Sequence, residues 1–488
     1  MAWPDAIYTS AGVRAIDACA IERYGVPGYT LMQRAAAAAL NALTARFGEG
    51  VRLLVVTGGG NNGGDGFVLA RLALAAGMET DVVALVEPSR LGGDAATAAA
   101  DFLSGASLCD DLDGALAAAD VVVDAVLGSG LARDVDSEFA RVIQAINDSA
   151  RPVVALDIPS GLDSDSGAVR GVAVQAVLTV TFVAHKAGLW LGAGPGLCGE
   201  LELATLEIPP GAAADVEPVL RLLNRATAPP LPPRRRDVHK GRAGHVLIVG
   251  GNHGMPGAAL LAGSAALVAG AGLVTVATRP AHAVAMAMAR PELMCVGVEE
   301  PAALAPLLEA ATVVAVGPGL GRDPWSKGML AAALGGGPPC VVDADGLNLL
   351  PDGFEPRDDW VLTPHPGEAA RLLGSSTAAV QGDRVAAVCE LQSRYGGVAV
   401  LKGVGSLVTA AGRLPAVCTD GTPAMAAPGM GDTLTGLIAA LRAQGLGAAD
   451  AAELGVAAHA YAGTAAARGR DRGLTASAVI AELAASLS

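Results

Sequence analysis

Two series of short apolar segments, separated by helical stretches, constrain the fold of this chain more than any other feature. The first series lies at residues 51–56, 81–86, 120–127, 153–157, 177–183 and 201–208. The second lies at residues 245–249, 273–277, 312–316, 340–343, 360–363 and 398–402. Such alternation is typical of mainly parallel sheets with helices on both faces. The sequence therefore predicts an α/β fold built from two three-layer domains.

Proline-rich runs at 209–214 and 228–233 divide the two series. The chain has 488 residues, which is too long for one ordinary hydrophobic core. We expect a first domain at 1–215, a linker at 216–240 and a second domain at 241–488. Because 52% of the residues are apolar but only 3% are aromatic, the cores must be built mostly from Ala, Val and Leu.

Charge and cysteine content exclude several functional classes. The formal net charge is −15, and the basic run at 232–240 has no interleaved aromatic residues, so nucleic acid is not an expected partner. The seven cysteines have no paired spacing, which favours a reduced, cytoplasmic location without disulfides or zinc. The uncharged run at 258–278 is interrupted by glycines, so we expect a buried helix, a turn and a strand there instead of a membrane span.

A glycine turn before a helix marks the C-terminal part of the second domain. Gly429 and Gly431 allow successive backbone N–H groups to face one point, and an apolar helix at 433–441 adds its positive end. This arrangement predicts a phosphate-binding hole. Asp432 can accept a proton from a hydroxyl that attacks a phosphoryl group, or it can simply cap the helix. Both interpretations remain open from these residues alone.

A second glycine-rich segment, at 57–66, connects the strand at 51–56 to a helix expected at 67–76. Gly58, Gly60 and Gly63 match G-x-G-x-x-G, and Glu87 follows the next strand, where a ribose-binding acid is expected. An ordinary phosphate loop avoids carboxylates. Because Asn61, Asn62 and Asp65 lie in this segment, we expect it to bind hydroxyls, amides or a cation as well as phosphate.

Polar residues also end several strands of the first domain. Asp124 lies in an apolar run and needs a partner, which can be a cation, a buried amide such as that of Asn62, an added proton or the amides of a loop. Asp157 and Ser160 follow the next strand. Parallel strands would bring these side chains to one edge of the sheet. Lys186 follows a later strand and can meet phosphate or lie solvated in a turn.

These motifs resemble the NAD(P)H-hydrate epimerase family. The resemblance is carried by Asn-Asn-Gly-Gly-Asp-Gly at 61–66, Asp-Ala-Val-Leu-Gly-Ser-Gly-Leu at 124–131 and Asp-Ile-Pro-Ser-Gly at 157–161. It implies a Rossmann-like domain that binds hydrated nicotinamide nucleotides and a K⁺ ion held by Asn62, Asp124 and Ser160. It also implies that Asp157 contacts the substrate, and we take it as the candidate acid/base at C6. We expect its replacement by asparagine to spare folding.

The resemblance further implies a set of residues that contact the epimerase substrate. They are Asn61, Asn62, Gly63, Gly64, Asp65, Gly128, Ser129, Gly130, Leu131, Ala132, Arg133, Asp134 and Asp157. The sequence departs from the family pattern at Gln33, where glutamate is common.

Chemically marked loops follow the strands of the second domain. The run Gly-Pro-Gly-Leu-Gly at 317–321 permits close backbone approach to a ligand, and Asp343 and Asp345 follow the next strand. His365 stands between two prolines, and Lys402 begins another glycine loop. Each feature alone is also compatible with an ordinary turn or a helix cap.

Together these loops resemble the NAD(P)H-hydrate dehydratase family of the ribokinase-like superfamily. The resemblance implies that ADP, with Mg²⁺, phosphorylates the C6 hydroxyl of the S-hydrate and that loss of phosphate restores NADH or NADPH. Asp432 would be the base. The implied hydrate contacts are Ala258, Gly319, His365 and Asp432, and the implied nucleotide contacts are Lys402, Gly403, Val404, Gly405, Ser406 and Gly431. Pro428 departs from the glycine that is common in this family.

The resulting prediction is a bifunctional, homo-oligomeric repair enzyme whose partners are small molecules, with no nucleic acid and no membrane. One alternative is a small-molecule kinase of the ribokinase type with a regulatory first domain. Another makes the first domain a ligand-binding module without activity.

Overall fold

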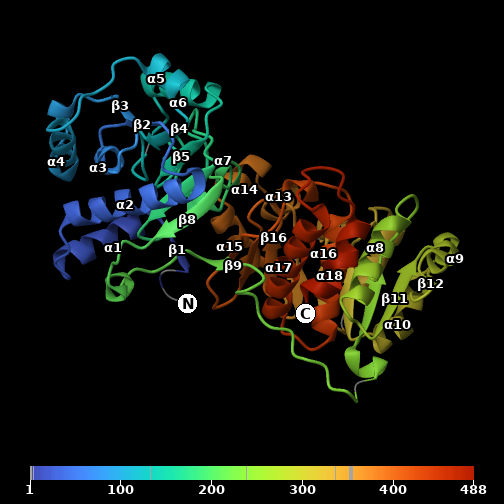
Figure 1. Cartoon of the computed structure of the whole chain (residues 1–488). Helices are drawn as coiled ribbons and strands as arrows, with labels where there is room; N and C mark the ends of the chain where they lie inside the picture. The colour runs from blue at the N-terminus through green and yellow to red at the C-terminus, as the bar shows by residue number, and fades with distance from the viewer. Residues whose placement is uncertain are drawn as a thin grey trace. The chain divides into compact units, whose positions relative to one another are not determined.

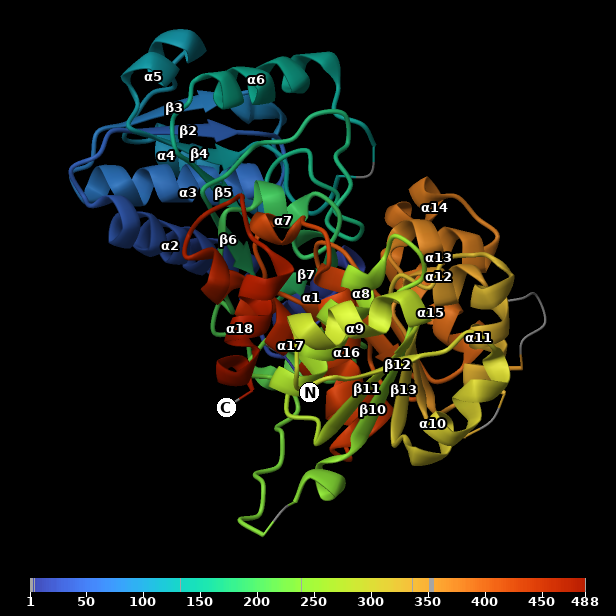
Figure 2. The same ribbon diagram turned by 90° about the vertical axis from the view of Figure 1, so that its right-hand side faces the viewer.

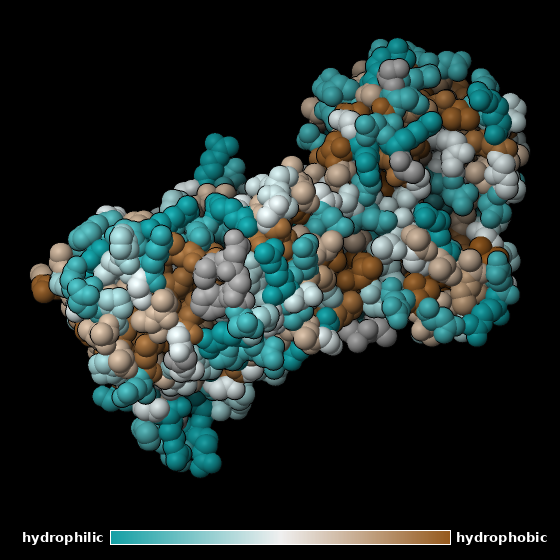
Figure 3. All heavy atoms as spheres, turned by 180° about the vertical axis from the view of Figure 1, so that it is seen from behind, coloured by the Kyte–Doolittle hydropathy of each residue, from teal (hydrophilic) through white to brown (hydrophobic). Residues whose placement is uncertain are grey.

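The computed structural model describes residues 3, 5–131, 133–237, 239–335, 337–350 and 355–487. The chain forms two compact units, Met1–Arg221 and Leu222–Ser488 (Figure 1). The predicted linker at 216–240 contains strand β9 (Leu220–Leu223), and the predicted domain limits stay a proposal. Polar residues cover much of the face in Figure 3, with apolar residues in groups between them.

The first unit contains a parallel sheet that confirms the predicted α/β architecture. Its strand order is β3 (Thr80–Ala84), β2 (Leu53–Thr57), β4 (Val121–Ala125), β5 (Val153–Leu156), β6 (Leu178–Phe182) and β8 (Glu200–Ala204). Outside this sheet, β1 (Ala6–Tyr8) pairs in parallel with β7 (His185–Lys186).

Helices cover both faces of this sheet (Figure 2). One face carries α1 (Ser10–Glu22), α2 (Gly28–Phe47), α3 (Asn61–Ala75) and α4 (Gly93–Leu103). The other carries α5 (Leu112–Ala118) and α6 (Ser137–Asp148). Many of the buried helical residues are alanines, such as Ala35, Ala36 and Ala39, so the low aromatic content is matched by close backbone packing.

Helix α3 begins at Asn61, so the predicted loop at 57–66 is wrong over its second half. A Cβ atom on Gly63 would lie 2.2 Å from the carbonyl oxygen of Gly58, and one on Gly66 would lie 2.6 Å from the Cβ atom of Ala125. These glycines therefore let the first turns of the helix pack against the strands. Tertiary packing overrides the weak helix propensity of the glycine run.

The second unit contains a larger sheet with the same parallel character. Its order is β12 (Met294–Gly297), β11 (Leu273–Thr278), β10 (His245–Val249), β13 (Val313–Val316), β14 (Cys340–Val342), β15 (Trp360–Leu362) and β16 (Val398–Leu401), all paired in parallel. Strands β17 (Leu407–Ala410) and β18 (Ala416–Cys418) continue it in antiparallel pairing.

Helices also flank this sheet on both faces (Figure 2). One face carries α8 (Pro256–Val268), α16 (Met430–Ala443), α17 (Ala448–Ala467) and α18 (Ala476–Ser486). On the opposite side lie α10 (Ala305–Ala310), α11 (Pro324–Leu334), α13 (Pro366–Leu373) and α15 (Arg384–Tyr395). Shorter segments are α9 (Pro280–Ala289), α12 (Ala344–Asn348) and α14 (Thr377–Gly382).

The uncharged run at 258–278 forms most of α8, a turn and β11, as predicted. Helix α8 packs directly against α16, because a Cβ atom on Gly436 would lie only 1.9 Å from the carbonyl oxygen of Ala262. Among the described residues, no helix combines the length and the apolar character that a membrane span requires.

Candidate active sites

A cavity of about 760 Å³ lies in the first unit, at the carboxyl ends of β2, β4 and β5. Of the predicted substrate contacts, the cavity wall includes Asn61, Asn62, Asp65, Gly128, Ser129, Gly130, Leu131, Arg133 and Asp157. Gly63 and Gly64 instead pack inside the unit, against Gly58 and Met32. Asp134 and Glu87 are exposed away from the wall, and Ala132 lies outside the described residues. The structure thus groups most, but not all, of the predicted set.

Asp124 is fully buried and meets hydrogen-bond donors from two neighbouring strand ends. Its Oδ2 accepts from the backbone N–H of Ser160 at 2.8 Å, and its Oδ1 accepts from the Ser160 hydroxyl at 2.6 Å and from the N–H of Val126 at 3.2 Å. Burial nevertheless raises the pKa of Asp124 to about 6. Loop amides and a hydroxyl are therefore its partners within the protein.

Asn62 lies at the same end of the cavity and is only 8% exposed. Both side-chain polar atoms, Oδ1 and Nδ2, are buried without a hydrogen-bond partner in the described structure. Leaving a buried amide unpaired costs about 1–3 kcal/mol. An oxygen-liganded cation would satisfy Oδ1, so the donor set of Asn62, Asp124 and Ser160 fits the expected K⁺ ion in its chemistry.

Asp157 and Lys186 form an ion pair whose lysine is 1% exposed at its side chain. Lys186 Nζ also donates to Thr181 Oγ1 at 2.9 Å and to the carbonyl of Phe182 at 2.8 Å. The interpretation of Lys186 as a solvated turn residue is therefore wrong. Pairing of β1 with β7 removes this lysine from solvent, a tertiary effect that the local sequence does not show.

Two further carboxylates surround this ion pair. Asp17 on α1 lines the cavity, and burial raises its pKa to about 6, with Lys186 opposing and Asp157 adding to the shift. Burial and the nearby Asp157 also raise the pKa of Asp65 well above its usual range. The sequence analysis missed Asp17. Its signal is a carboxylate that adjoins the buried stripe of Val13, Ile16 and Ala20 on one helix.

The second unit brings its predicted polar residues together around a buried ion pair. Lys402 Nζ lies 2.5 Å from Asp343 Oδ1 and 3.9 Å from Glu368 Oε2. Thr435 donates to Asp343 Oδ2 at 2.8 Å. Lys402 holds the pKa of Asp343 below its usual value despite complete burial. Asp343 occupies the N-cap position of α12 but makes no side-chain capping bond, so the ion pair is its structural role.

Asp432 lies in the first turn of α16, two residues inside the helix start at Met430. The N-cap residue is Gly429, whose φ of 85° requires the left-handed region that glycine favours. The interpretation of Asp432 as the capping residue is therefore wrong, and the helix begins earlier than predicted. Burial, followed by the charge of Asp343, raises the pKa of Asp432 to about 6, which suits a general base near neutral pH.

Gly431, next to Asp432 in the chain, faces the Asp343–Lys402 ion pair. A Cβ atom there would lie 3.2 Å from Lys402 Nζ and 3.5 Å from Asp343 Oδ2. A hydrogen atom at this position keeps the space between the helix start and the lysine open. The predicted phosphate hole and the lysine thus face the same small space.

His365 caps helix α13 through its ring. Its Nδ1 accepts from the N–H groups of Gly367 at 2.9 Å and Glu368 at 3.3 Å, and Glu368 Oε2 accepts from the N–H of His365 at 2.8 Å. An Nδ1 acceptor places the ring proton on Nε2 of the neutral imidazole. Burial and the charge of Lys402 lower the pKa of His365. The ring is therefore neutral and fixed at the edge of the site.

The backbone of the predicted nucleotide loop at 402–406 is held by Arg384, a residue that the sequence did not point to. Arg384 Nη2 donates to the carbonyls of Leu401 at 3.3 Å, Lys402 at 3.4 Å and Gly405 at 3.3 Å. Within the loop, Ser406 Oγ accepts from the N–H of Gly403 at 3.2 Å. Val404 is 65% exposed at the loop tip.

The glycine run at 317–321 follows β13 and also lies at the carboxyl edge of this sheet. A Cβ atom on Gly319 would lie 3.0 Å from the Cβ atom of Ala258, so the two predicted hydrate contacts adjoin each other. Asp345 accepts from the N–H of Gly321 at 3.0 Å and pairs with Arg322 at 3.1 Å. Asp345 therefore supports the glycine run.

The chain is an α/β protein with two units, each built on a mainly parallel sheet. In each unit, ionisable side chains gather at the carboxyl edge of the sheet, so each unit has its own candidate active site. A family model described as NAD(P)H-hydrate dehydratase matches residues 246–484, and one described as YjeF-related protein N-terminus matches residues 28–188. Each match falls within one structural unit.

The chain belongs to the family of bifunctional NAD(P)H-hydrate repair enzymes. It is 47% identical to the bifunctional NAD(P)H-hydrate repair enzyme Nnr of Coxiella burnetii, over 96% of this chain and 97% of that protein. It is 39% identical to the enzyme of the same name from Escherichia coli, over 98% of this chain and 93% of that protein. The predicted family is thereby confirmed for both halves.

A solved structure also resembles part of this chain. It is the ADP/ATP-dependent NAD(P)H-hydrate dehydratase of Bacillus subtilis co-crystallised with ATP and Mg²⁺, which is 27% identical. The alignment has a TM-score of 0.47 and covers 54% of this chain and 94% of that chain.

Proposed function

We propose that this chain repairs hydrated NADH and NADPH in two steps. The first unit interconverts the R- and S-hydrates at C6, and the second dehydrates the S-hydrate with ADP to give NADH or NADPH, AMP and phosphate. The observation that carries this proposal is the 47% identity to a bifunctional repair enzyme over 96% of the chain. The two ionisable clusters supply side chains suited to each step.

In the second unit, Asp432 accepts the proton of the C6 hydroxyl while the hydroxyl oxygen attacks the β-phosphorus of ADP. The new bond is O–P, and the broken bond is the anhydride bond to AMP. The N–H groups of Gly429 to Gly431 and the ammonium of Lys402 stabilise the transferring group. Departure of phosphate from C6 with loss of a proton from C5 then restores the dihydropyridine.

Magnesium fits a carboxylate at this edge. Glu368 offers a carboxylate oxygen 3.9 Å from Lys402 Nζ, and Mg²⁺ bound to phosphates prefers one or two such ligands. The ion would neutralise charge on the transferring phosphoryl group. We assign the hydrate to Ala258, Gly319, His365 and Asp432, and the adenine nucleotide to the loop at 402–406 with Gly431.

In the first unit, the hydrate occupies the 760 Å³ cavity, with Asp157 as the acid/base at C6. The ammonium of Lys186 pairs with the Asp157 carboxylate and holds it in position. Asn61, Asp65, Arg133 and the residues from Gly128 to Leu131 form the wall around the substrate. We further propose a cytoplasmic location and a homo-oligomeric state.

A direct assay tests the proposed function. Purified protein is given S-hydrate or R-hydrate, each with ADP, with ATP or without nucleotide, while absorbance of the reduced nicotinamide is followed. We expect ADP-dependent recovery from both epimers, with free phosphate formed in equal amount. A small-molecule kinase would instead leave a stable phosphoester, and absence of absorbance recovery from S-hydrate would refute the proposal.

Potassium dependence provides a separate prediction for the first unit. Because Oδ1 of Asn62 has no hydrogen-bond partner among the described residues, Asn62→Ala should remove a ligand and raise the K⁺ concentration for half-maximal epimerisation by on the order of tenfold or more. The measurement is R-hydrate conversion in KCl, with choline chloride keeping ionic strength constant.

Asn147→Ala is the matched control, because Asn147 has hydrogen-bond partners at both ends of its amide, Ala173 and Gln175. This control should leave the K⁺ requirement unchanged. Equal epimerisation in choline chloride and in KCl would contradict the assignment of the ion.

A further inference from the structure

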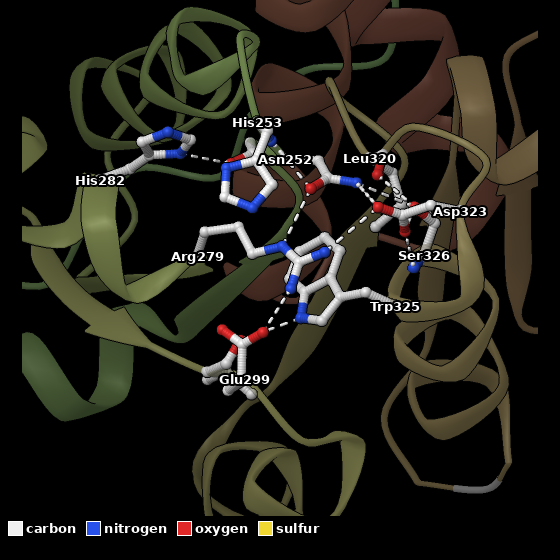
Figure 4. A network of polar contacts seen from close by, with 11 residues as sticks. Asn252, His253, Arg279, His282, Glu299, Leu320, Asp323, Trp325 and Ser326 are labelled. Carbon is white, nitrogen blue, oxygen red and sulfur yellow. Dashed lines mark hydrogen bonds and ion pairs between the residues drawn. The ribbon is translucent and has the colours of Figure 1, made fainter.

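A polar network with a buried centre and an exposed rim lies at the carboxyl ends of β10, β11, β12 and β13 in the second unit (Figure 4). Asn252 follows β10, Arg279 follows β11, Glu299 follows β12, and Asp323 lies beyond β13 at the N-cap of α11. Asp343 and Lys402 follow β14 and β16, which lie farther along the same sheet. The network therefore forms the other half of the same sheet edge.

Asn252 is the centre of this network and is 4% exposed. Its Oδ1 accepts from Arg279 Nε at 2.9 Å, and its Nδ2 donates to Asp323 Oδ2 and to Ser326 Oγ, both at 3.1 Å. Figure 4 shows the carboxamide between the guanidinium and the carboxylate. Both ends of one buried side chain are thus fixed by groups from two other segments, the end of β11 and the start of α11.

Arg279 uses each part of its guanidinium inside the protein. Nη1 donates to Glu299 at 2.6 Å, Nη2 donates to Asp323 at 3.2 Å, and the guanidinium carbon lies 4.4 Å from the ring centre of Trp325. The side chain is only 9% exposed. A guanidinium engaged in this way acts as a rigid fork. It holds loops in place and is not directed toward a phosphate of the ligand.

The network is connected to the predicted hydrate contacts through the backbone. The N–H of Asn252 donates to the carbonyl of Gly319 at 2.7 Å, and the N–H of Gly251 donates to that of Pro318 at 3.0 Å. Ser326 Oγ donates to the carbonyl of Leu320 at 2.6 Å. Three successive carbonyls of the glycine run are therefore bonded to this cluster or to the loop that carries it.

Glycine at 319 has a φ of 58°, and a Cβ atom there would lie 2.6 Å from the carbonyl oxygen of Met255. The run at 317–321 and the loop before α8 therefore touch, with Ala258 on the first turn of that helix. Displacement of either segment would change the position of both predicted hydrate contacts.

We propose that Asn252 and Arg279 are positioning residues for the hydrate. They hold the run at 317–321 against the start of α8, and in the part of the chain that the structure describes their side-chain hydrogen bonds go to other segments than the nucleotide loop at 402–406. This inference rests on the proposed dehydration of the S-hydrate. It predicts that weakening the network raises the KM for S-hydrate but not the KM for ADP.

The test uses Arg279→Lys and Asn252→Ala in the full chain, with steady-state kinetics in S-hydrate and in ADP. Lysine keeps the charge but cannot reproduce the planar fork, whereas alanine removes the bridging amide. We expect kcat/KM for S-hydrate to fall by about ten- to a hundredfold, mostly through KM. The KM for ADP should stay within about twofold of the original value.

Arg357→Lys is the matched control. The Arg357 side chain is half-buried. Its Nε and Nη2 donate to the carboxylate of Asp359 at 2.9 Å and 2.8 Å, and its Nη1 donates to the carbonyl of Leu334 at 2.9 Å. It precedes β15 and so lies at the amino edge of the same sheet. We expect this variant to lower the melting temperature without changing the KM for S-hydrate.

Four outcomes decide the proposal. A selective rise of the hydrate KM in both network variants, but not in Arg357→Lys, supports it. Unchanged hydrate kinetics in folded Arg279→Lys would overturn it, as would an equal rise of both KM values. If the unmodified protein failed to convert S-hydrate at all, the proposed function itself would fall and this inference with it.

Discussion

Replacement of Asp432 by asparagine should reduce ADP-dependent dehydration of the S-hydrate by about two to four orders of magnitude, the usual contribution of a positioned general base. Asparagine has nearly the same shape and leaves the helix start at Gly429 intact, but it cannot accept the hydroxyl proton. The measurement is the rate of absorbance recovery at saturating ADP and S-hydrate. Conversion of R- to S-hydrate by the first unit should persist in the same protein.

Asp450→Asn is the control for a carboxylate in the first turn of a neighbouring helix. Asp450 lies in the first turn of α17 (Ala448–Ala467) and pairs with Arg413, not with the Asp343–Lys402 ion pair of the site. Its replacement should leave dehydration unchanged. An undiminished rate in Asp432→Asn would contradict the proposed mechanism.

The pH profile checks the same assignment. Because the pKa of Asp432 is raised to about 6, its ionised form decreases as the pH falls through that value. The dehydration rate of the unmodified protein should therefore drop on the acid side of about pH 6 and level off above it. The residual rate of Asp432→Asn should lack this acid limb.

Replacement of Asp157 by asparagine should abolish epimerisation and also destabilise the first unit. It removes the direct partner of the Lys186 ammonium, which is 1% exposed, and breaking a buried pair costs up to about 3–5 kcal/mol, less what the neighbouring Asp17 and Asp65 carboxylates restore. The ion pair thus argues against the expectation from sequence that this change spares folding. Calorimetry on the full chain measures the loss, and the dehydration of S-hydrate shows whether the second unit stays folded.

A double variant separates stability from chemistry. Asp157→Asn combined with Lys186→Met removes both charges, and replacing a buried pair by neutral groups is often nearly neutral for stability. Asparagine also tolerates the left-handed backbone of this position, where φ is 66°. We expect folding to recover while epimerisation stays absent. An active, folded double variant would show that Asp157 is not the acid/base.

The fold was predictable because the local sequence of most strands is enough to identify them. The segments that became β2, β4, β5 and β10 are short, apolar and rich in valine, so their burial on both faces could be inferred from the letters alone. The start of α3 could not be predicted in this way. Its glycines favour a loop by propensity, but in the folded chain Gly63 packs against Gly58 and Gly66 packs against Ala125, and this packing stabilises the helix.

The sites divide in the same way. Residues that follow strands, such as Asp343 and Lys402, were predictable because parallel strands share one carboxyl edge. Lys186 and Arg384 were not recognised, since each is buried by segments whose pairing is absent from the local sequence. Asn252 and Arg279 carried no motif at all. Their partners are spread from Asn252 to Ser326, so only the folded chain reveals the network.

The backbone contact between α8 and α16 has a consequence for how the second site can work. Asp432 and Ala258 stand on these two helices, and Gly436 brings the helices so close that even a methyl group would not fit between them. The spacing between the proposed base and the proposed hydrate contact is thus fixed by helix packing. We expect any opening during turnover to involve exposed segments, such as the loop around Val404 with its 65% exposed tip, and not a separation of these helices.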